Sequence, residues 1–194
     1  ETLRIAGIRA AAFHEGLSIV ARDRAAAWFA DREDGAQVLV CSEIGSEGRN
    51  FQFAHHLVLF DLPLNPDLLE QRIGRLDRIG QSETIQIHLG YLENSAQETL
   101  YHWYQDGLGA FEQLNPAAPT VHARLQARLL DLLANPDPAG EAALLAEAGV
   151  LSRATQAALQ QGRDRLLELN SCREAEARRL VEALHAQDAD PTLW

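Results

Sequence analysis

Residues 71–81 read QRIGRLDRIGQ, and this stretch indicates more about the fold than any other part of the chain. Arg72, Arg75 and Arg78 recur at every third position, so they begin on one face of a helix. Two glycines allow the chain to turn there and to approach another surface closely. Guanidinium groups that rise from a helix end into a glycine loop suit phosphate oxygens. A solvated arginine face would explain the spacing but not the glycines and flanking glutamines, so we predict a phosphate-binding site.

The sequence on both sides of this stretch alternates short apolar runs with amphipathic ones, which is typical of βαβ units around a parallel sheet. Residues 37–41 (QVLVC) and 57–60 (LVLF) are continuous apolar runs, as expected of strands buried on both faces. Residues 8–13 and 84–91 are the other predicted strands. Asn65-Pro66-Asp67 opens a helix, with proline in the first turn. These patterns predict an α/β fold with a parallel sheet.

After residue 92 the sequence pattern is typical of helices only. Ser95-Ala96-Gln97-Glu98 is a capping-box sequence, which predicts a helix start. We expect a helical extension over residues 93–150, in which one helix ends at Gly149. Residues 151–194 read either as a helical hairpin, with a second capping box at Ser171, or as one long helix.

The composition excludes several classes of protein. The chain has 194 residues, and its 17 positive charges are all arginine, so a phosphate-binding loop of the GxxxxGK[ST] kind and a lysine Schiff base are excluded. A formal net charge of −11 disfavours an independent nucleic-acid binder. Two cysteines are too few for a four-cysteine zinc site, and we predict no metal site. No apolar run is long enough for a bilayer span, so we expect a cytoplasmic protein without a membrane partner.

Residues 71–78 match the pattern Q-x-x-G-R-x-x-R and resemble motif VI of superfamily-two helicases. With Asn65-Pro66 before it and Ile79-Gly80-Gln81 after it, the stretch resembles the Swi/Snf-type branch of that family in particular. Residues 41–50 (CSEIGSEGRN) follow a predicted strand and resemble motif V, and Phe13-His14-Glu15-Gly16 resembles a strand end of the same lobe. The resemblance implies that residues 1–92 are most of a second RecA-like lobe, truncated at its N-terminus.

The resemblance also implies roles for individual residues. Arg75 and Arg78 match the two arginines that this lobe supplies to the phosphates of ATP, and Arg78 is the better candidate for the arginine finger. The residues implied to bind the nucleotide are Gln71, Gly74, Gly48 and Glu47, and those implied to bind nucleic acid are Ser42 and Asn50. Glu43 and Glu47 stand where eukaryotic relatives commonly carry basic and apolar residues.

Residues 42–54 (SEIGSEGRNFQFA) and 60–81 resemble a bacterial branch of this family whose members associate with RNA polymerase and help to recycle it. This implies RNA polymerase, double-stranded DNA and a first RecA-like lobe as partners, and ATP with Mg²⁺ held by that lobe as cofactor. The chain, which contains no methionine, is then expected to be an internal piece that does not hydrolyse ATP alone. The alternative is an interaction module that docks on the polymerase through the acidic helical segment. A further strand, inside the sheet, is expected from residues upstream of the chain.

Overall fold

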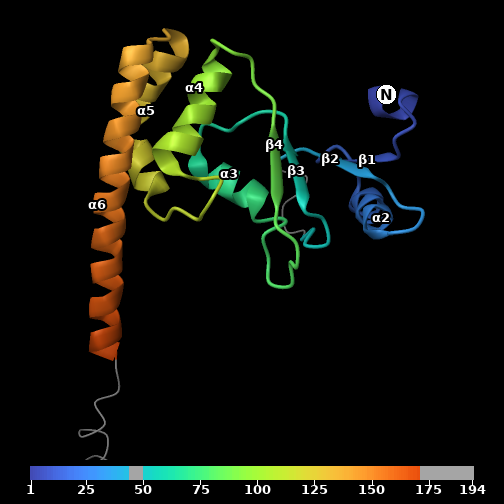
Figure 1. Ribbon diagram of the computed structural model, residues 1–194. Coiled ribbons are helices and arrows are strands. Elements are labelled where there is room, and N and C mark those ends of the chain that lie inside the picture. The colour runs from blue at the N-terminus through green and yellow to red at the C-terminus, as the bar shows by residue number, and fades with distance from the viewer. Residues whose placement is uncertain (44–49, 171–194) are drawn as a thin grey trace, which may run out of the picture.

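The computed structural model describes residues 1–43 and 50–170 (Figure 1). An α/β region is followed by a layer of helices that packs against one side of it. The strands are β1 (Ala10–Phe13), β2 (Val38–Cys41), β3 (His56–Leu59) and β4 (Gln86–Leu89). The helices are α1 (Thr2–Ile5), α2 (Ile19–Ala30), α3 (Pro66–Ile73), α4 (Ala96–His102), the π-helix η2 (Trp103–Leu108), α5 (Ala118–Ala134) and α6 (Pro138–Asn170). The four predicted strands are confirmed, and so is the change to helix alone after the last strand.

The four strands pair in parallel, but in two separate pairs. β1 pairs with β2 in the register Ala10↔Val38, and β3 pairs with β4 in the register His56↔Gln86. No ladder of hydrogen bonds joins the two pairs within residues 1–43 and 50–170. The four strands therefore do not close into one sheet, and a further inner strand from outside the chain stays a prediction.

The strands are covered on one face, not on both. Leu59 of β3 is buried, whereas its neighbour Val58 is 71% exposed and Phe60 is 92% exposed. Val40 of β2 is also more than half exposed. The prediction of two buried faces from the continuous apolar runs is therefore wrong for this chain. A run of apolar residues indicates which strands are able to be covered on both sides, but the covering elements must be present as well.

Local sequence explains where the helices start. The side chain of Asn65 accepts a hydrogen bond from the Asp67 amide at 2.9 Å, and Pro66 occupies the first turn of α3, as predicted. Ser95 accepts from the Gln97 amide at 3.2 Å at the start of α4. Glu98 of the predicted capping box does reach back, but it accepts from the amide of Asn94 rather than that of Ser95. The helix start is confirmed and the reciprocal bond is shifted by one residue.

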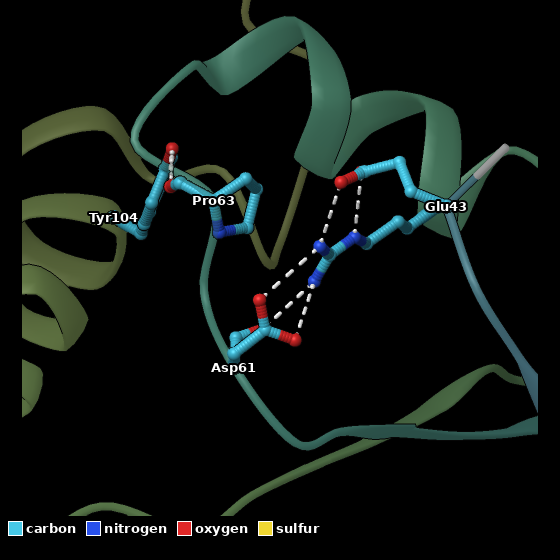
Figure 2. Close-up of polar contacts among 5 residues, drawn as sticks. Glu43, Asp61, Pro63 and Tyr104 are labelled. Carbon is cyan, nitrogen blue, oxygen red and sulfur yellow. Dashed lines mark hydrogen bonds and ion pairs between the residues drawn. The ribbon is translucent and has the colours of Figure 1, made fainter.

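The core lies where the helices meet the second strand pair. Trp103 and Tyr104 are fully buried among α4, α5 and α6, and Leu59 of β3 and Leu69 of α3 belong to the same apolar cluster. The hydroxyl of Tyr104 donates to the backbone carbonyl of Pro63 at 2.7 Å (Figure 2). The helical layer is therefore anchored to the loop between β3 and α3 by both apolar packing and a buried hydrogen bond.

The long helix α6 corrects one boundary of the helical region. It runs without interruption from Pro138 to Asn170, so the predicted helix end at Gly149 is wrong. Leu144, Ala148 and Ser152 lie one turn apart and are all buried, because this stripe packs on α5 and η2. That packing outweighs the roughly 1 kcal/mol that a glycine costs inside a helix.

The predicted helix 171–187 lies outside the described residues, so the choice between a hairpin and a single helix beyond residue 170 stays open. None of the described helices combines the length and the low charge that crossing a bilayer would require.

We predict that Tyr104→Phe lowers the free energy of unfolding by about 1–3 kcal/mol, because it leaves the buried Pro63 carbonyl without its partner. Burial raises the pKa of the Tyr104 phenol, so the hydroxyl remains a donor throughout the usual pH range. Urea unfolding measures the change. Tyr91→Phe is the matched control, because the Tyr91 ring stacks on Tyr101 at the surface and keeps this contact as phenylalanine. Equal effects of the two substitutions would contradict the anchoring role.

Candidate functional site

The guanidinium of Arg72 on α3 forms hydrogen bonds with Glu43 and Asp61, which each follow a strand and are labelled in Figure 2. Its Nε and Nη2 donate to the two carboxylate oxygens of Glu43, at 3.0 and 3.1 Å. Its Nη1 donates to the backbone carbonyl of Asp61 at 2.7 Å. Its Nη1 and Nη2 each lie 3.5 Å from one carboxylate oxygen of Asp61. Glu43 follows β2 and Asp61 follows β3, so a single side chain links the carboxyl ends of the two strand pairs.

The surroundings of Arg72 favour its protonated, positively charged form. The side chain is only 19% exposed. Burial by itself would lower the pKa of Arg72, but the hydrogen bonds and negative charges of Glu43 and Asp61 outweigh burial and raise it. A bidentate pair of this kind is directional as well as strong, so it holds α3 in one orientation.

This geometry corrects the prediction of three arginines directed at phosphate. Arg72 is engaged by two carboxylates, so it is a structural residue and does not face a phosphate ligand. It also explains Glu43, whose acidic side chain is the partner of Arg72. Sequence reasoning missed this network, although a usable signal existed. Glu43 and Asp61 each follow a predicted strand closely, and the carboxyl ends of parallel strands meet at one edge.

A groove with a volume of about 1050 Å³ lies between α3 and the loop that precedes α5. Gln71, Gly74, Arg75 and Arg78 all line it, whereas Arg72 does not. The structure thus brings together four of the residues that were predicted to contact the nucleotide. The opposite wall comes from residues 110–115, in the loop between η2 and α5 of the helical layer.

Arg78 is exposed, and its Nε donates to the carbonyl of Gly74 at 2.8 Å. Arg75 is half-buried, and its backbone carbonyl accepts from the amide of Phe51 at 2.8 Å. Gly80 has a φ of +100°, a left-handed conformation that favours glycine and that turns the chain directly after Arg78. The predicted turn is confirmed, and the Arg78 side chain remains accessible to a ligand.

Gln81, at the end of the loop after α3, fixes this loop to neighbouring backbone by hydrogen bonds. Nε2 of Gln81 donates to the carbonyls of Ala54 and Leu76, at 2.9 and 3.3 Å. The loop that carries Arg78 is therefore held at both ends, at Gly74 by the arginine itself and at Gln81 by these two bonds.

The residues predicted to contact nucleic acid lie elsewhere. Ser42 follows β2 and donates to the carboxylate of Glu15, which follows β1, at 2.5 Å. This hydrogen bond is the largest of the influences that lower the pKa of Glu15. Asn50 is exposed, and neither Ser42 nor Asn50 lines the groove. Glu47 and Gly48 lie outside the described residues, so their predicted roles stay predictions.

The sequence predicts no metal site, and the structure shows which possible metal ligands lie close together. Across residues 1–43 and 50–170, no group of three or more histidine, cysteine, aspartate or glutamate side chains is arranged to hold a metal ion.

Two conserved domain families match this chain. The family described as helicase conserved C-terminal domain matches residues 1–80, and the one described as RNA polymerase recycling family C-terminal matches residues 84–194. The RNA polymerase-associated protein RapA of Pseudomonas aeruginosa (strain LESB58) is 59% identical over 191 residues. That match covers 98% of this chain and 20% of the relative, so the chain spans about a fifth of its length. A crystal structure of the C-terminal part of the Fun30 ATPase domain is 18% identical with a TM-score of 0.48, and covers 67% of this chain and 42% of its own.

We predict that Arg72→Ala lowers the free energy of unfolding by about 1–3 kcal/mol, because it leaves the Glu43 carboxylate without its bidentate partner. The matched control is Arg128→Ala, which breaks the exposed pair with Glu147 and is expected to cost less than about 1 kcal/mol. Urea unfolding of both variants measures the difference. A cycle with Glu43→Ala isolates the pairwise coupling, and additive effects of the two substitutions would contradict the linking role.

Proposed function

The chain belongs to the RNA polymerase recycling family. On this premise we propose that it is part of an ATP-dependent translocase of double-stranded DNA that associates with RNA polymerase. In this proposal, residues 1–92 are most of the second RecA-like lobe. ATP binds between this lobe and a first lobe that lies outside the chain. The name of the Pseudomonas relative supports the association with RNA polymerase.

One observation carries the proposal: Gln71, Gly74, Arg75 and Arg78 line the same groove, and Arg78 is exposed beside the turn at Gly80. An arginine finger must reach the phosphates of a nucleotide bound elsewhere, so it has to be exposed and yet held at its base. The bond from Arg78 to the Gly74 carbonyl and the bonds of Gln81 supply that restraint. Arg75, three residues earlier in the chain, is the second candidate.

The work is divided between this chain and the rest of the protein. Bound ATP with Mg²⁺ supplies the transferable phosphoryl group, and an arginine finger stabilises its charge in the transition state. This chain contains no lysine and thus no phosphate-binding loop, and its described residues offer no metal-ligand cluster. The chain alone is therefore proposed not to hydrolyse ATP, because its arginines have no positioned nucleotide to act on.

We expect Arg78→Ala in the full-length protein to reduce DNA-stimulated ATP hydrolysis by about 10³- to 10⁵-fold, equivalent to roughly 4–7 kcal/mol. Arg75→Ala is expected to have a smaller or equal effect. Polymerase binding is expected to be unchanged, because neither side chain belongs to the helical segment. Arg128→Ala, on the exposed face of α5, is the arginine control. Hydrolysis by Arg78→Ala at the rate of the parent protein would refute the finger assignment.

A second candidate function is an interaction module that docks on RNA polymerase through the helical segment. Residues 93–194 carry fifteen acids and only eight arginines, which favours contact with a basic surface. α4, η2, α5 and α6 share one apolar core, so they form a firm support for such a surface. The two functions are compatible within one protein.

For this second function we predict that Glu93→Lys combined with Asp106→Lys weakens polymerase binding, measured by co-sedimentation, and leaves ATP hydrolysis unchanged. Both side chains are exposed, so the substitutions change the charge of the segment without disturbing its core. This outcome is the reverse of that expected for the arginine variants. The same two substitutions made at Glu33 and Asp34 of the α/β region serve as the control. Loss of hydrolysis without loss of binding would contradict the docking role of the segment.

A further inference from the structure

The groove beside α3 has an apolar floor that the proposed function does not use. Ile73 of α3, Ile85 and Ile87 of the last strand region and Phe111 of the opposite loop all line it and are half-buried. Leu114 lies at the edge and is 67% exposed. The groove has a volume of about 1050 Å³, at the upper end of the size of small-molecule pockets, about 300–1000 Å³. It therefore has room for a larger apolar group.

The walls of the groove are rich in acid. Five carboxylates line it, and they are those of Asp67, Glu70, Asp77, Glu83 and Glu112. The cations that line it are Arg75 and Arg78, so the wall is negative on balance. None of the five carboxylates forms an ion pair within the described parts of the chain, although Glu112 accepts a hydrogen bond from Gln105 at 3.0 Å.

These two properties decide what kind of molecule fits. A nucleic acid that filled the groove would place many negative charges beside five carboxylates, which outnumber the two arginines, so its binding there is disfavoured. A second copy of this chain carries a net charge of −11, so the negative walls of the groove would repel it as well. An occupant must instead combine apolar side chains for the floor with positive side chains for the walls.

We propose that the groove is the docking site for an amphipathic segment of a partner protein, with lysine or arginine on one side and aliphatic residues on the other. Aliphatic side chains of the segment lie on Ile85, Ile87 and Phe111, and its cationic side chains pair with Glu70 and Glu83 on the walls. This inference rests on the groove and its charges, not on the arginine-finger role. Because α3 forms one wall, a docked segment lies beside Arg75 and Arg78.

The probe is a fluorescein-labelled helical peptide of about five turns, or about 18 residues, with leucine on one face and lysine on the other. A scrambled peptide of the same composition and a peptide with glutamate in place of lysine are the controls. Fluorescence anisotropy with this chain is expected to give an affinity about tenfold higher for the amphipathic peptide than for the scrambled one. The glutamate peptide is expected not to bind, and high salt is expected to weaken binding of the lysine peptide.

Matched variants locate the binding site. Glu70→Gln combined with Glu83→Gln is expected to weaken binding by about 3- to 10-fold, whereas Glu33→Gln combined with Glu93→Gln, with the same change of charge at exposed sites outside the groove, is not. Leu114→Ser is expected to weaken binding by a similar factor of about 3–10 through its lost apolar contact. The control Leu92→Ser, at a residue that is 71% exposed and outside the groove, is expected to have no effect.

Several outcomes would overturn the proposal. Equal weakening by the two glutamine pairs, or equal affinity for the scrambled peptide, would mean that only the overall negative charge attracts the probe. Displacement of the peptide by a DNA duplex would identify a nucleic acid as the occupant of the groove. A concentration-dependent dimer in sedimentation that Leu114→Ser abolishes would identify a second copy as the occupant. An ATPase defect of Arg78→Ala is independent of all these results, so the two proposals fail separately.

Discussion

The bidentate pair between Arg72 and Glu43, extended to Asp61, is the interaction on which the α/β region depends. The two strand pairs share no ladder of hydrogen bonds in the described residues, so side chains must carry the connection between them. Arg72 can do this because a guanidinium presents several donors in a fixed plane and reaches two strand ends at once. The cost of burying its charge is offset by two carboxylates and a carbonyl.

The same helix is held from its other side by the helical layer. Leu69 of α3 is buried in the core with Trp103 and Tyr104, and Tyr104 also bonds the loop that leads into α3. A helix fixed on two sides presents its remaining residues in a defined direction. Gln71 on α3, together with Arg75 and Arg78 in the turn that follows it, therefore lines a groove whose far wall belongs to the helical layer, so residues of both halves of the chain form one surface.

Several parts of the fold and site could be predicted because they depend on residues close in sequence. Asn65-Pro66 and Ser95 mark helix starts, and Gly80 marks a turn with positive φ, since each acts on a backbone within a few residues of itself. The predictions for Gly149 and for the faces of the strands were wrong for the opposite reason. Gly149 lies in a helix whose buried stripe packs on α5 and η2, and the exposure of Val58 depends on elements distant in sequence.

The sequence by itself determined the α/β order, the helical segment and the position of Arg75 and Arg78 just after the helix that Asn65-Pro66 opens. These properties follow from periodicity, caps and local spacing. Only the tertiary structure decided that Arg72 pairs with Glu43 and Asp61 while Arg78 stays exposed. The three arginines share the same spacing and chemistry, so these two properties alone do not show which of them pairs with carboxylates. What separates them is which carboxylates the folded chain brings within reach, and Glu43 is 29 residues from Arg72 along the chain.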